Sequence, residues 1–155
     1  MTQRLNYAKA SPEGFKAMRQ LQAHVDGCGL EHPLLELVKM RASQINGCAY
    51  CLDMHSKDAR AAGEAEQRLY VLPAWREAPF YSERERAALA WCEALTQLPA
   101  HDQSVPDALY KEASAQFDEK ELVDLTLLVG SINVWNRINI AARPEVGDYK
   151  PGMFG

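Results

Sequence analysis

The sequence predicts an all-α protein, and three observations lead to this fold class. No segment alternates apolar and polar residues between hairpin turns, which is the pattern typical of a half-buried strand. Apolar residues instead recur at helical spacing along most of the 155 residues. Residues that start and stop helices divide these runs, and the last run is long and apolar enough for a central helix. We therefore expect one domain, residues 1–155, with its helices packed around the long last one.

The first half of the chain is expected to form three long helices. Pro12 and Pro33 each stand where a helix begins, because a proline is tolerated in the first helical turn. Gly27, Gly47 and Gly63 follow apolar periodic runs, and glycine is typical of the position just after a helix. These signals predict helices over residues 12–25, 33–45 and about 48–62.

In the second half of the chain, prolines mark the connections between helices, and two acidic caps mark helix starts. Ser82–Glu85 forms a capping box, and Asp118–Glu121 caps the longest helix of the chain. The expected order is a short helix over 64–72, an irregular connection from Pro73 to Pro79, a helix from Ser82 through Leu95, a loop from Pro99 to Ser104, a helix over about 105–115, the longest helix over 122–142 and an irregular tail from Pro144.

Composition excludes several classes of protein. Hydrophobic residues make up 47% of the chain and charged residues 25%, which excludes a disordered chain. The net charge is −4, and no Lys/Arg cluster is present to follow phosphates, so we expect no nucleic-acid partner. No apolar run approaches the roughly 20 residues that cross a bilayer, and the N-terminus lacks an apolar signal core. We therefore expect no membrane association and a cytoplasmic location.

The chemistry-bearing residues concentrate in the stretch Cys48-Ala-Tyr-Cys51-Leu-Asp-Met-His55. At 3.6 residues per turn, the two thiols lie one turn apart and His55 lies one turn after Cys51, on about the same face. Neighbouring thiols can close a disulfide, and an imidazole at this spacing can take the proton that a thiol loses before it attacks. The helix N-terminus favours a thiolate at Cys48, whereas the histidine favours Cys51. We expect Cys51 to be the attacking thiol.

Four interpretations compete for the thiol pair. Structural zinc would need a fourth ligand, and no second paired spacing occurs among the remaining candidates Cys28, Cys92, His24, His32 and His101. Two inert core cysteines are a second interpretation, which the adjacent histidine disfavours. Haem attachment would need a histidine directly after the second cysteine, where Leu52 stands. We favour redox chemistry that uses neither a metal ion nor another cofactor, and we expect Cys28 and Cys92 to be buried, apolar-like thiols.

Glu36 is the candidate acid–base residue upstream of the thiols. It interrupts an apolar run over residues 34–38, so its carboxylate either faces solvent or is partly buried with a raised pKa. A raised pKa suits a proton shuttle near neutrality. Helical periodicity alone favours the solvent-facing position. However, the thiol pair one short helix downstream needs a base. Its presence makes us favour the partly buried position, with a raised pKa, over the solvent-facing one.

The order Glu36, eleven residues, Cys48-x-x-Cys51, three residues and His55 closely resembles the motif of the alkyl hydroperoxidase D family. That family lies within the carboxymuconolactone decarboxylase superfamily, and segments 82–91 and 132–137 resemble its later helices more weakly. The resemblance implies a thiol-dependent peroxidase on an all-α scaffold, assembled as a homo-oligomer, commonly a trimer or a hexamer. Cys51 would be the peroxidatic thiol, Cys48 the resolving thiol, and Glu36 with His55 the proton relay.

The resemblance also implies the reaction partners. These are a small hydroperoxide and an external dithiol or disulfide reductant, which is a lipoyl-bearing protein in the best-studied branch. That branch has a histidine immediately before the peroxidatic thiol, where this chain has Tyr50. A tyrosine, with its ordinary pKa near 10, does not shuttle protons at neutral pH in the same way. Either the relay shortens to Glu36 and His55, or the substrate differs. A decarboxylase-like lyase on the same scaffold and a redox-sensing thiol protein are the alternatives.

Overall fold

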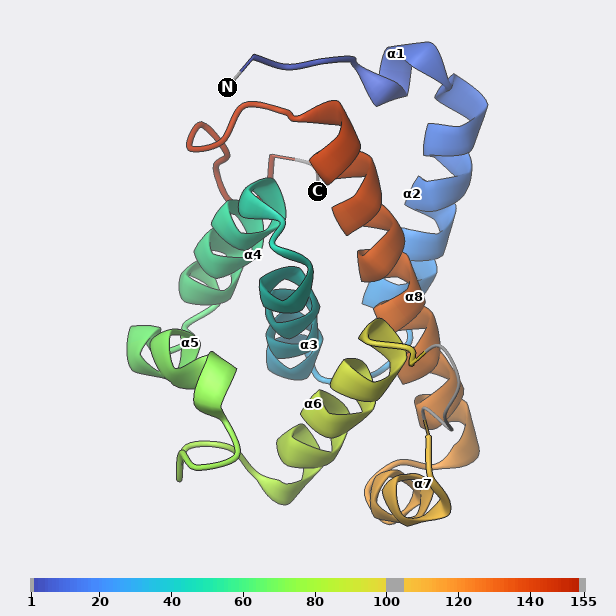
Figure 1. The fold of residues 1–155 in the computed structure, drawn as a ribbon, viewed down its shortest axis with the longest axis vertical. Helices are drawn as coiled ribbons and strands as arrows, with labels where there is room; N and C mark the ends of the chain where they lie inside the picture. Colours follow the sequence, from blue (N-terminus) through green and yellow to red (C-terminus); the bar gives the residue numbers. More distant parts are fainter. Residues whose placement is uncertain (1, 100–104, 154–155) are drawn as a thin grey trace.

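The computed structural model describes residues 2–99 and 105–153, and over these ranges the chain is all-α, as predicted (Figure 1). Within them it forms eight α-helices, one short 3₁₀ helix and no strand. The elements are α1 (Tyr7–Ala10), α2 (Pro12–Asp26), α3 (His32–Asn46), α4 (Ala49–Ala61), α5 (Glu66–Val71), η1 (Leu72–Ala74), α6 (Glu83–Thr96), α7 (Asp107–Ser114) and α8 (Glu119–Ala142).

Two helices organise the packing. The long α8 contacts α2, α3, α4, α6 and α7, which confirms the expected central role of the last long helix. Helix α3 lies near the centre of the molecule in Figure 1 and packs against α4, α6 and α8. One apolar cluster joins α3 to α2, α6 and α8, and a second joins it to α4, α5, η1 and α6. Because α3 is covered on both sides, its polar residues at positions 36, 39 and 43 are buried as well.

The local signals in the sequence act as expected. Gly47 ends α3 in the left-handed region, at φ 67°, a conformation that glycine adopts without a steric penalty. Ser82 and Glu85 form a reciprocal capping box at α6, and Asp118 and Glu121 form another at α8. These caps satisfy backbone N–H groups that the first helical turn leaves without partners. Local chemistry therefore sets where α4, α6 and α8 begin.

Two short elements were not predicted. Helix α1 begins at Tyr7 and is capped by Asn6, whose side chain accepts a hydrogen bond from the Lys9 backbone at 3.0 Å. The 3₁₀ helix η1 lies at the start of the connection that was expected to be irregular, with Pro73 in its first turn. The predicted loop from Pro99 onward lies outside the described residues from position 100 to 104. No helix in the described ranges is both long and apolar enough to cross a membrane.

The irregular C-terminal tail docks on α4. The Lys57 ammonium donates to the carbonyl oxygens of Gly147 and Tyr149, at 2.7 and 3.1 Å. The Gly147 N–H donates to the Asp53 carboxylate at 3.2 Å. The Tyr149 hydroxyl lies 2.8 and 2.9 Å from the two carboxylate oxygens of Asp58, and Tyr149 is buried. The tail therefore forms a wall beside the part of α4 that carries the predicted site.

Candidate redox site

The two motif cysteines form a disulfide at the junction of α3 and α4. Cys48 is the N-cap residue of α4, and its sulfur accepts a hydrogen bond from the Cys51 backbone N–H at 3.3 Å. The Cα atoms of Cys48 and Cys51 are 5.4 Å apart, within the usual range for a disulfide. Both residues are buried, with exposed fractions of 1% and 0%. The α3–α4 turn thus brings the predicted thiol pair into bonding contact, away from bulk solvent.

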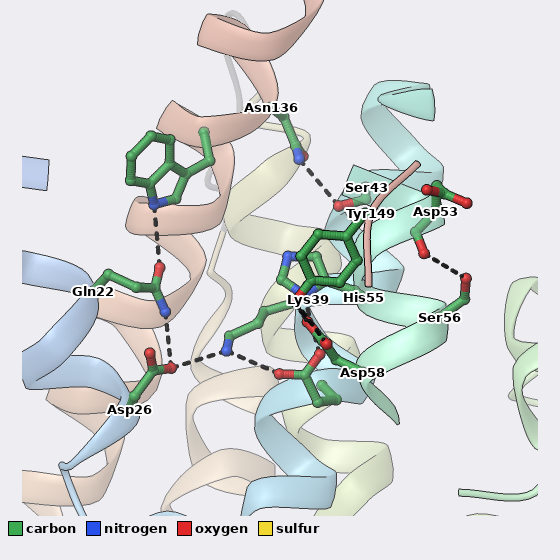
Figure 2. Close-up of polar contacts among 12 residues, drawn as sticks. Gln22, Asp26, Lys39, Ser43, Asp53, His55, Ser56, Asp58, Asn136 and Tyr149 are labelled. Atoms are coloured by element: carbon green, nitrogen blue, oxygen red, sulfur yellow. Dashed lines mark hydrogen bonds and ion pairs between the residues drawn. The ribbon is translucent and has the colours of Figure 1, made fainter. Parts of the chain in front are cut away.

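A row of charged side chains leads from α2 to the motif histidine. Oε1 of Glu36 accepts from the Lys39 ammonium at 3.0 Å, and Oε2 lies 3.0 Å from Nδ1 of His55. Lys39 also donates to Asp26 at 2.9 Å, and Figure 2 shows its ammonium between Asp26 and the neighbouring carboxylate. Glu36, Lys39 and His55 are all buried. The structure therefore joins Glu36 to His55 directly, as the motif predicted.

The predicted raised pKa of Glu36 is wrong. Burial alone raises the pKa of this carboxyl, but the hydrogen bond and charge of His55 and the charge of Lys39 outweigh it and lower the pKa to about 2. Lys39 follows Glu36 by three residues and thus lies on the same helical face. Glu36 is consequently an anion at neutral pH. It contacts Nδ1 of His55, so Nε2 is the ring nitrogen that does not contact Glu36.

Sequence reasoning missed Asn139, on α8, as a member of the site. Its Nδ2 donates to the Cys51 sulfur at 3.4 Å, while its Oδ1 is buried without a hydrogen-bond partner. Asn136, one turn earlier, has both amide ends satisfied: its Oδ1 accepts from Asn46 at 2.8 Å. Its Nδ2 donates to Ser43 at 3.0 Å, as Figure 2 shows. Leaving a buried polar atom unpaired costs about 1–3 kcal/mol, so it marks a position that is not optimised for stability.

A signal for Asn139 was present in the sequence. Asn133, Asn136 and Asn139 recur every three residues in the largely apolar C-terminal half of α8, which places them along one side of the helix. Such a polar stripe on a buried helix must face other polar groups, because buried amides need partners. The stripe could therefore have indicated that α8 contributes to the site.

A first cavity, of about 580 Å³, lies on the histidine side of the disulfide. His55, Glu36 and Lys39 line it, together with Met54 and the tail residue Tyr149. Further lining comes from the aromatic rings of Tyr7, Phe15 and Trp135, which contact one another with centroids 5.9 to 6.3 Å apart. We call this space the histidine-side cavity. It combines an acid–base group with an apolar aromatic wall.

A second cavity, of about 690 Å³, lies against Cys48. Ala49, Ile140 and Arg143 also line it, and we call it the Cys48-side cavity. Tyr50 and Asn139 line both cavities. Of these two cavities, His55 lines only the first and Cys48 only the second.

The structure also places Tyr50 and the two cysteines outside the motif, Cys92 and Cys28. Tyr50 is half-buried, and burial raises the pKa of its hydroxyl, which therefore stays protonated at neutral pH. Cys92 is buried as predicted, and burial raises the pKa of its thiol to about 12. Cys28 is only half-buried, because it follows Gly27 in the exposed turn between α2 and α3.

Of the zinc-ligand candidates, His101 lies outside the described residues. Elsewhere in the described ranges, no group of three or more His, Cys, Asp or Glu side chains is placed to hold a metal ion.

The sequence of the chain also matches known proteins. The sequence model of the carboxymuconolactone decarboxylase family matches residues 12–94, a stretch that contains Glu36, both motif cysteines and His55. This chain belongs to the carboxymuconolactone decarboxylase family. As a member of that family, it carries the resemblance to alkyl hydroperoxidase D that the motif predicted.

Three proteins similar to this carboxymuconolactone decarboxylase family member show how much of the chain the similarity covers. It is 46% identical to the uncharacterized protein YdfG of Bacillus subtilis (strain 168), over 91% of this chain and 95% of YdfG. A crystal structure of ATU0492 from Agrobacterium tumefaciens, a protein of unknown function with a proposed AhpD role in antioxidant defence, matches with a TM-score of 0.89. That match has 44% identity and covers 96% of this chain and 100% of ATU0492. The debrominase Bmp8 matches in fold alone, with a TM-score of 0.79 and 23% identity over 90% of this chain and 74% of Bmp8.

Proposed function

We propose that this protein is a thiol-dependent peroxidase, in which Cys48 and Cys51 cycle between dithiol and disulfide. The observation that carries the proposal is the disulfide at the start of α4, one turn before a buried histidine that is paired with an ionised carboxylate. A lyase has no use for two bonded thiols. The substrate we propose is a small organic hydroperoxide, because the histidine-side cavity has an aromatic wall next to the polar groups.

In the first proposed step, the Cys51 thiolate attacks the outer oxygen of the hydroperoxide. The sulfur–oxygen bond forms as the oxygen–oxygen bond breaks, so the thiol is oxidised to a sulfenic acid and the peroxide is reduced. The departing alkoxide takes a proton from His55, which received that proton from the Cys51 thiol. Cys51 lines neither cavity while the disulfide holds it. This step therefore belongs to the dithiol state.

In the second proposed step, Cys48 resolves the sulfenic acid. The Cys48 sulfur attacks the Cys51 sulfur, the disulfide forms, and the hydroxyl group leaves with the Cys48 proton as water. The short distance between the two residues favours this reaction, since their Cα atoms already lie 5.4 Å apart across one helical turn. The structure corresponds to the product of this step.

Three neighbouring groups have supporting roles in this proposal. Glu36 is a fixed anion that orients His55, because its pKa is too low for it to carry a proton near neutrality. Lys39 holds Glu36 ionised through a contact of 3.0 Å. Asn139 donates an N–H to the Cys51 sulfur, and such a bond stabilises a thiolate.

Counting thiols tests the proposed function. The fully reduced protein has four cysteines, and one equivalent of an alkyl hydroperoxide should remove two thiols and release one equivalent of alcohol. Cys92 should survive because its pKa near 12 leaves almost no thiolate at neutral pH. Peptide mapping should then find the Cys48–Cys51 disulfide. An unconsumed hydroperoxide, or loss of Cys28 or Cys92 ahead of the motif pair, would count against the proposal.

Replacing Asn139 by alanine should weaken the Cys51 thiolate. A hydrogen bond to a charged group contributes about 1.5–3 kcal/mol, so the pKa of Cys51 should rise by about one to two units. The measurement is the pH dependence of iodoacetamide alkylation in the Cys48→Ser background, where Cys51 is the only motif thiol. Asn136→Ala is the matched control, because that amide contacts Ser43 and Asn46 and not the sulfur. Equal alkylation profiles for Asn139→Ala and its parent would remove Asn139 from the site.

A further inference from the structure

The side-chain amide of Asn139 has one end in use and one end without a partner. Its Nδ2 donates to the Cys51 sulfur at 3.4 Å. Among the buried side-chain nitrogen and oxygen atoms of residues 2–99 and 105–153, Oδ1 of Asn139 is the only one without a hydrogen-bond partner. The residue is 5% exposed, so bulk water does not satisfy this oxygen. Buried acceptors are nearly always bonded, and an exception beside a reactive sulfur points to a ligand.

The chemistry of the Cys51 sulfur fixes which end of the amide faces it. A sulfur in a disulfide and a thiolate sulfur both carry no hydrogen, so each can only accept a hydrogen bond. The amide must therefore present its N–H to Cys51 in both states, and Oδ1 stays close by, because it shares a carbon atom with Nδ2. Asn136, on the same helix, has both ends of its amide bonded. The unpaired oxygen is thus particular to the amide that contacts the sulfur.

We infer that Oδ1 of Asn139 accepts a hydrogen bond from the O–H of the hydroperoxide and holds its outer oxygen against the Cys51 sulfur. This inference rests on the proposed peroxidase function and adds a catalytic residue that touches the substrate. A hydroperoxide has one O–H group, on the same outer oxygen that the thiolate attacks. An acceptor beside the sulfur therefore positions the reacting atom itself. Asn139 also lines the histidine-side cavity, which is the proposed place of the hydroperoxide.

Opening of the disulfide gives the substrate access to this acceptor. In the disulfide state Cys51 lines neither cavity, and Oδ1 of Asn139 is buried. Two sulfur atoms that are no longer bonded cannot stay at bonding distance, so reduction separates the sulfurs of Cys51 and Cys48. Asn139 contacts Cys51 and shares in this rearrangement. The acceptor and the nucleophile therefore become accessible together, in the dithiol state that reacts with peroxide.

The same hydrogen bond serves before and after oxygen transfer. The Cys51 thiolate bonds to the outer oxygen, the oxygen–oxygen bond breaks, and the alkoxide leaves with the electron pair and takes a proton from His55. The outer oxygen keeps its hydrogen and becomes the hydroxyl group of the Cys51 sulfenic acid. Oδ1 of Asn139 accepts this O–H throughout, while Nδ2 stays on the sulfur. The amide does not turn during the step, and contacts that are already in place cost no reorganisation at the moment of reaction.

The ratio of two rate constants tests this inference. In the Cys48→Ser protein, Cys51 is either oxidised by cumene hydroperoxide or modified by methyl methanethiolsulfonate, which has no hydrogen-bond donor. Both reagents react with the thiolate, so at one pH the ratio of their rate constants does not depend on the pKa of Cys51. Adding Asn139→Leu removes the acceptor and should lower the ratio of the hydroperoxide rate to the thiolsulfonate rate about tenfold, which corresponds to one hydrogen bond. Mass spectrometry of the Cys51 peptide follows both reactions.

Two further variants separate the acceptor from other effects. Asn139→Asp keeps an acceptor oxygen and loses the N–H, so its ratio should stay within about threefold of the parent even though both rates fall as the pKa of Cys51 rises. Asn136→Leu is the control, because it makes the same substitution at an amide that does not contact the sulfur. Its ratio should stay within about twofold. Asn139→Ala also lacks the acceptor and gives the same comparison if the leucine variant does not fold.

The outcomes separate this inference from the proposed function. A ratio in Asn139→Leu equal to that of its parent would overturn the inference and leave the peroxidase proposal standing, provided that the parent forms a sulfenic acid. A ratio that falls equally in Asn139→Leu and Asn139→Asp would also overturn it, since the lost N–H would then explain the effect. If the Cys48→Ser protein reacts with the thiolsulfonate and not with the hydroperoxide, the peroxidase proposal is wrong and the inference fails with it.

Discussion

Replacing Cys51 by serine is expected to reduce hydroperoxide turnover at least about 10³-fold, because removing a nucleophile ends covalent catalysis. A serine hydroxyl at this position cannot form a sulfenic acid or a disulfide. The Cys48→Ser protein should behave differently. It should still react once with hydroperoxide, accumulate a sulfenic acid on Cys51 and then stop, since no resolving thiol is present. Single-turnover kinetics with dimedone trapping and mass spectrometry distinguish the two variants.

The same experiment decides which thiol attacks. Cys51 has the Asn139 amide at 3.4 Å and His55 one turn later on α4, whereas Cys48 has the backbone N–H at the helix start. A dimedone adduct on Cys48 in the Cys51→Ser protein, with none on Cys51 in the Cys48→Ser protein, would reverse the assignment. Both substitutions replace sulfur by oxygen, so circular dichroism should show the same helical content as in the parent.

Replacing Lys39 by methionine is expected to lower the free energy of unfolding by about 3–5 kcal/mol, because it removes the lysine partner of the buried Glu36 carboxylate. Lys39 is 5% exposed and contacts both Glu36 and Asp26. Urea denaturation at pH 7 measures the effect. Arg60→Met is the control, because its ion pair with Glu66 lies on the surface, and exposed ion pairs contribute little to stability.

The cost of Lys39→Met should depend on pH in a definite direction. The pKa of Glu36 is about 2 in the folded protein, against its ordinary 4.5, so the stability that its ionised form contributes is complete above about pH 4.5 and is lost as the pH falls toward 2. A neutral Glu36 no longer needs a cation. The difference between wild type and variant should therefore shrink below about pH 4.5.

A second substitution identifies the Glu36 carboxylate, which has lost its lysine partner, as the cause. Adding Glu36→Gln to Lys39→Met removes the buried negative charge and should restore part of the lost stability. A double variant that is less stable than Lys39→Met alone would contradict this explanation. So would a Lys39→Met protein that is as stable as the parent at pH 7.

The sequence predicted most of the fold because its signals are local. Proline at helix starts, glycine after helix ends and two acidic capping boxes each act within one or two turns of the chain. The capping boxes at Ser82 and Asp118, and the turn at Gly47, appear in the structure where they were expected. The docking of the tail on α4 has no local signal, since Tyr149 finds Asp58 only after the chain has folded.

The sequence predicted only part of the candidate site, because only part of the site is specified by local signals. The motif spacing anticipated two contacts, the Cys48–Cys51 disulfide and the pairing of His55 with Glu36, because these residues lie on two consecutive helices. The direction of the Glu36 pKa was wrong because the effect of a neighbouring cation was not weighed, although the sequence alone showed Lys39 one turn away. Asn139 comes from a helix 88 residues after Cys51, so its contact with the sulfur depends on tertiary packing.

The shared walls of the two cavities constrain how such a protein can diverge. Tyr50 and Asn139 line both spaces, whereas Met54 and Ile140 each line one. A mutation at a shared position therefore alters both cavities in one step. A mutation at Met54 or Ile140 alters the lining of one cavity and leaves the lining of the other unchanged. We expect variants in which only one cavity has changed its binding preference to carry substitutions at the unshared positions.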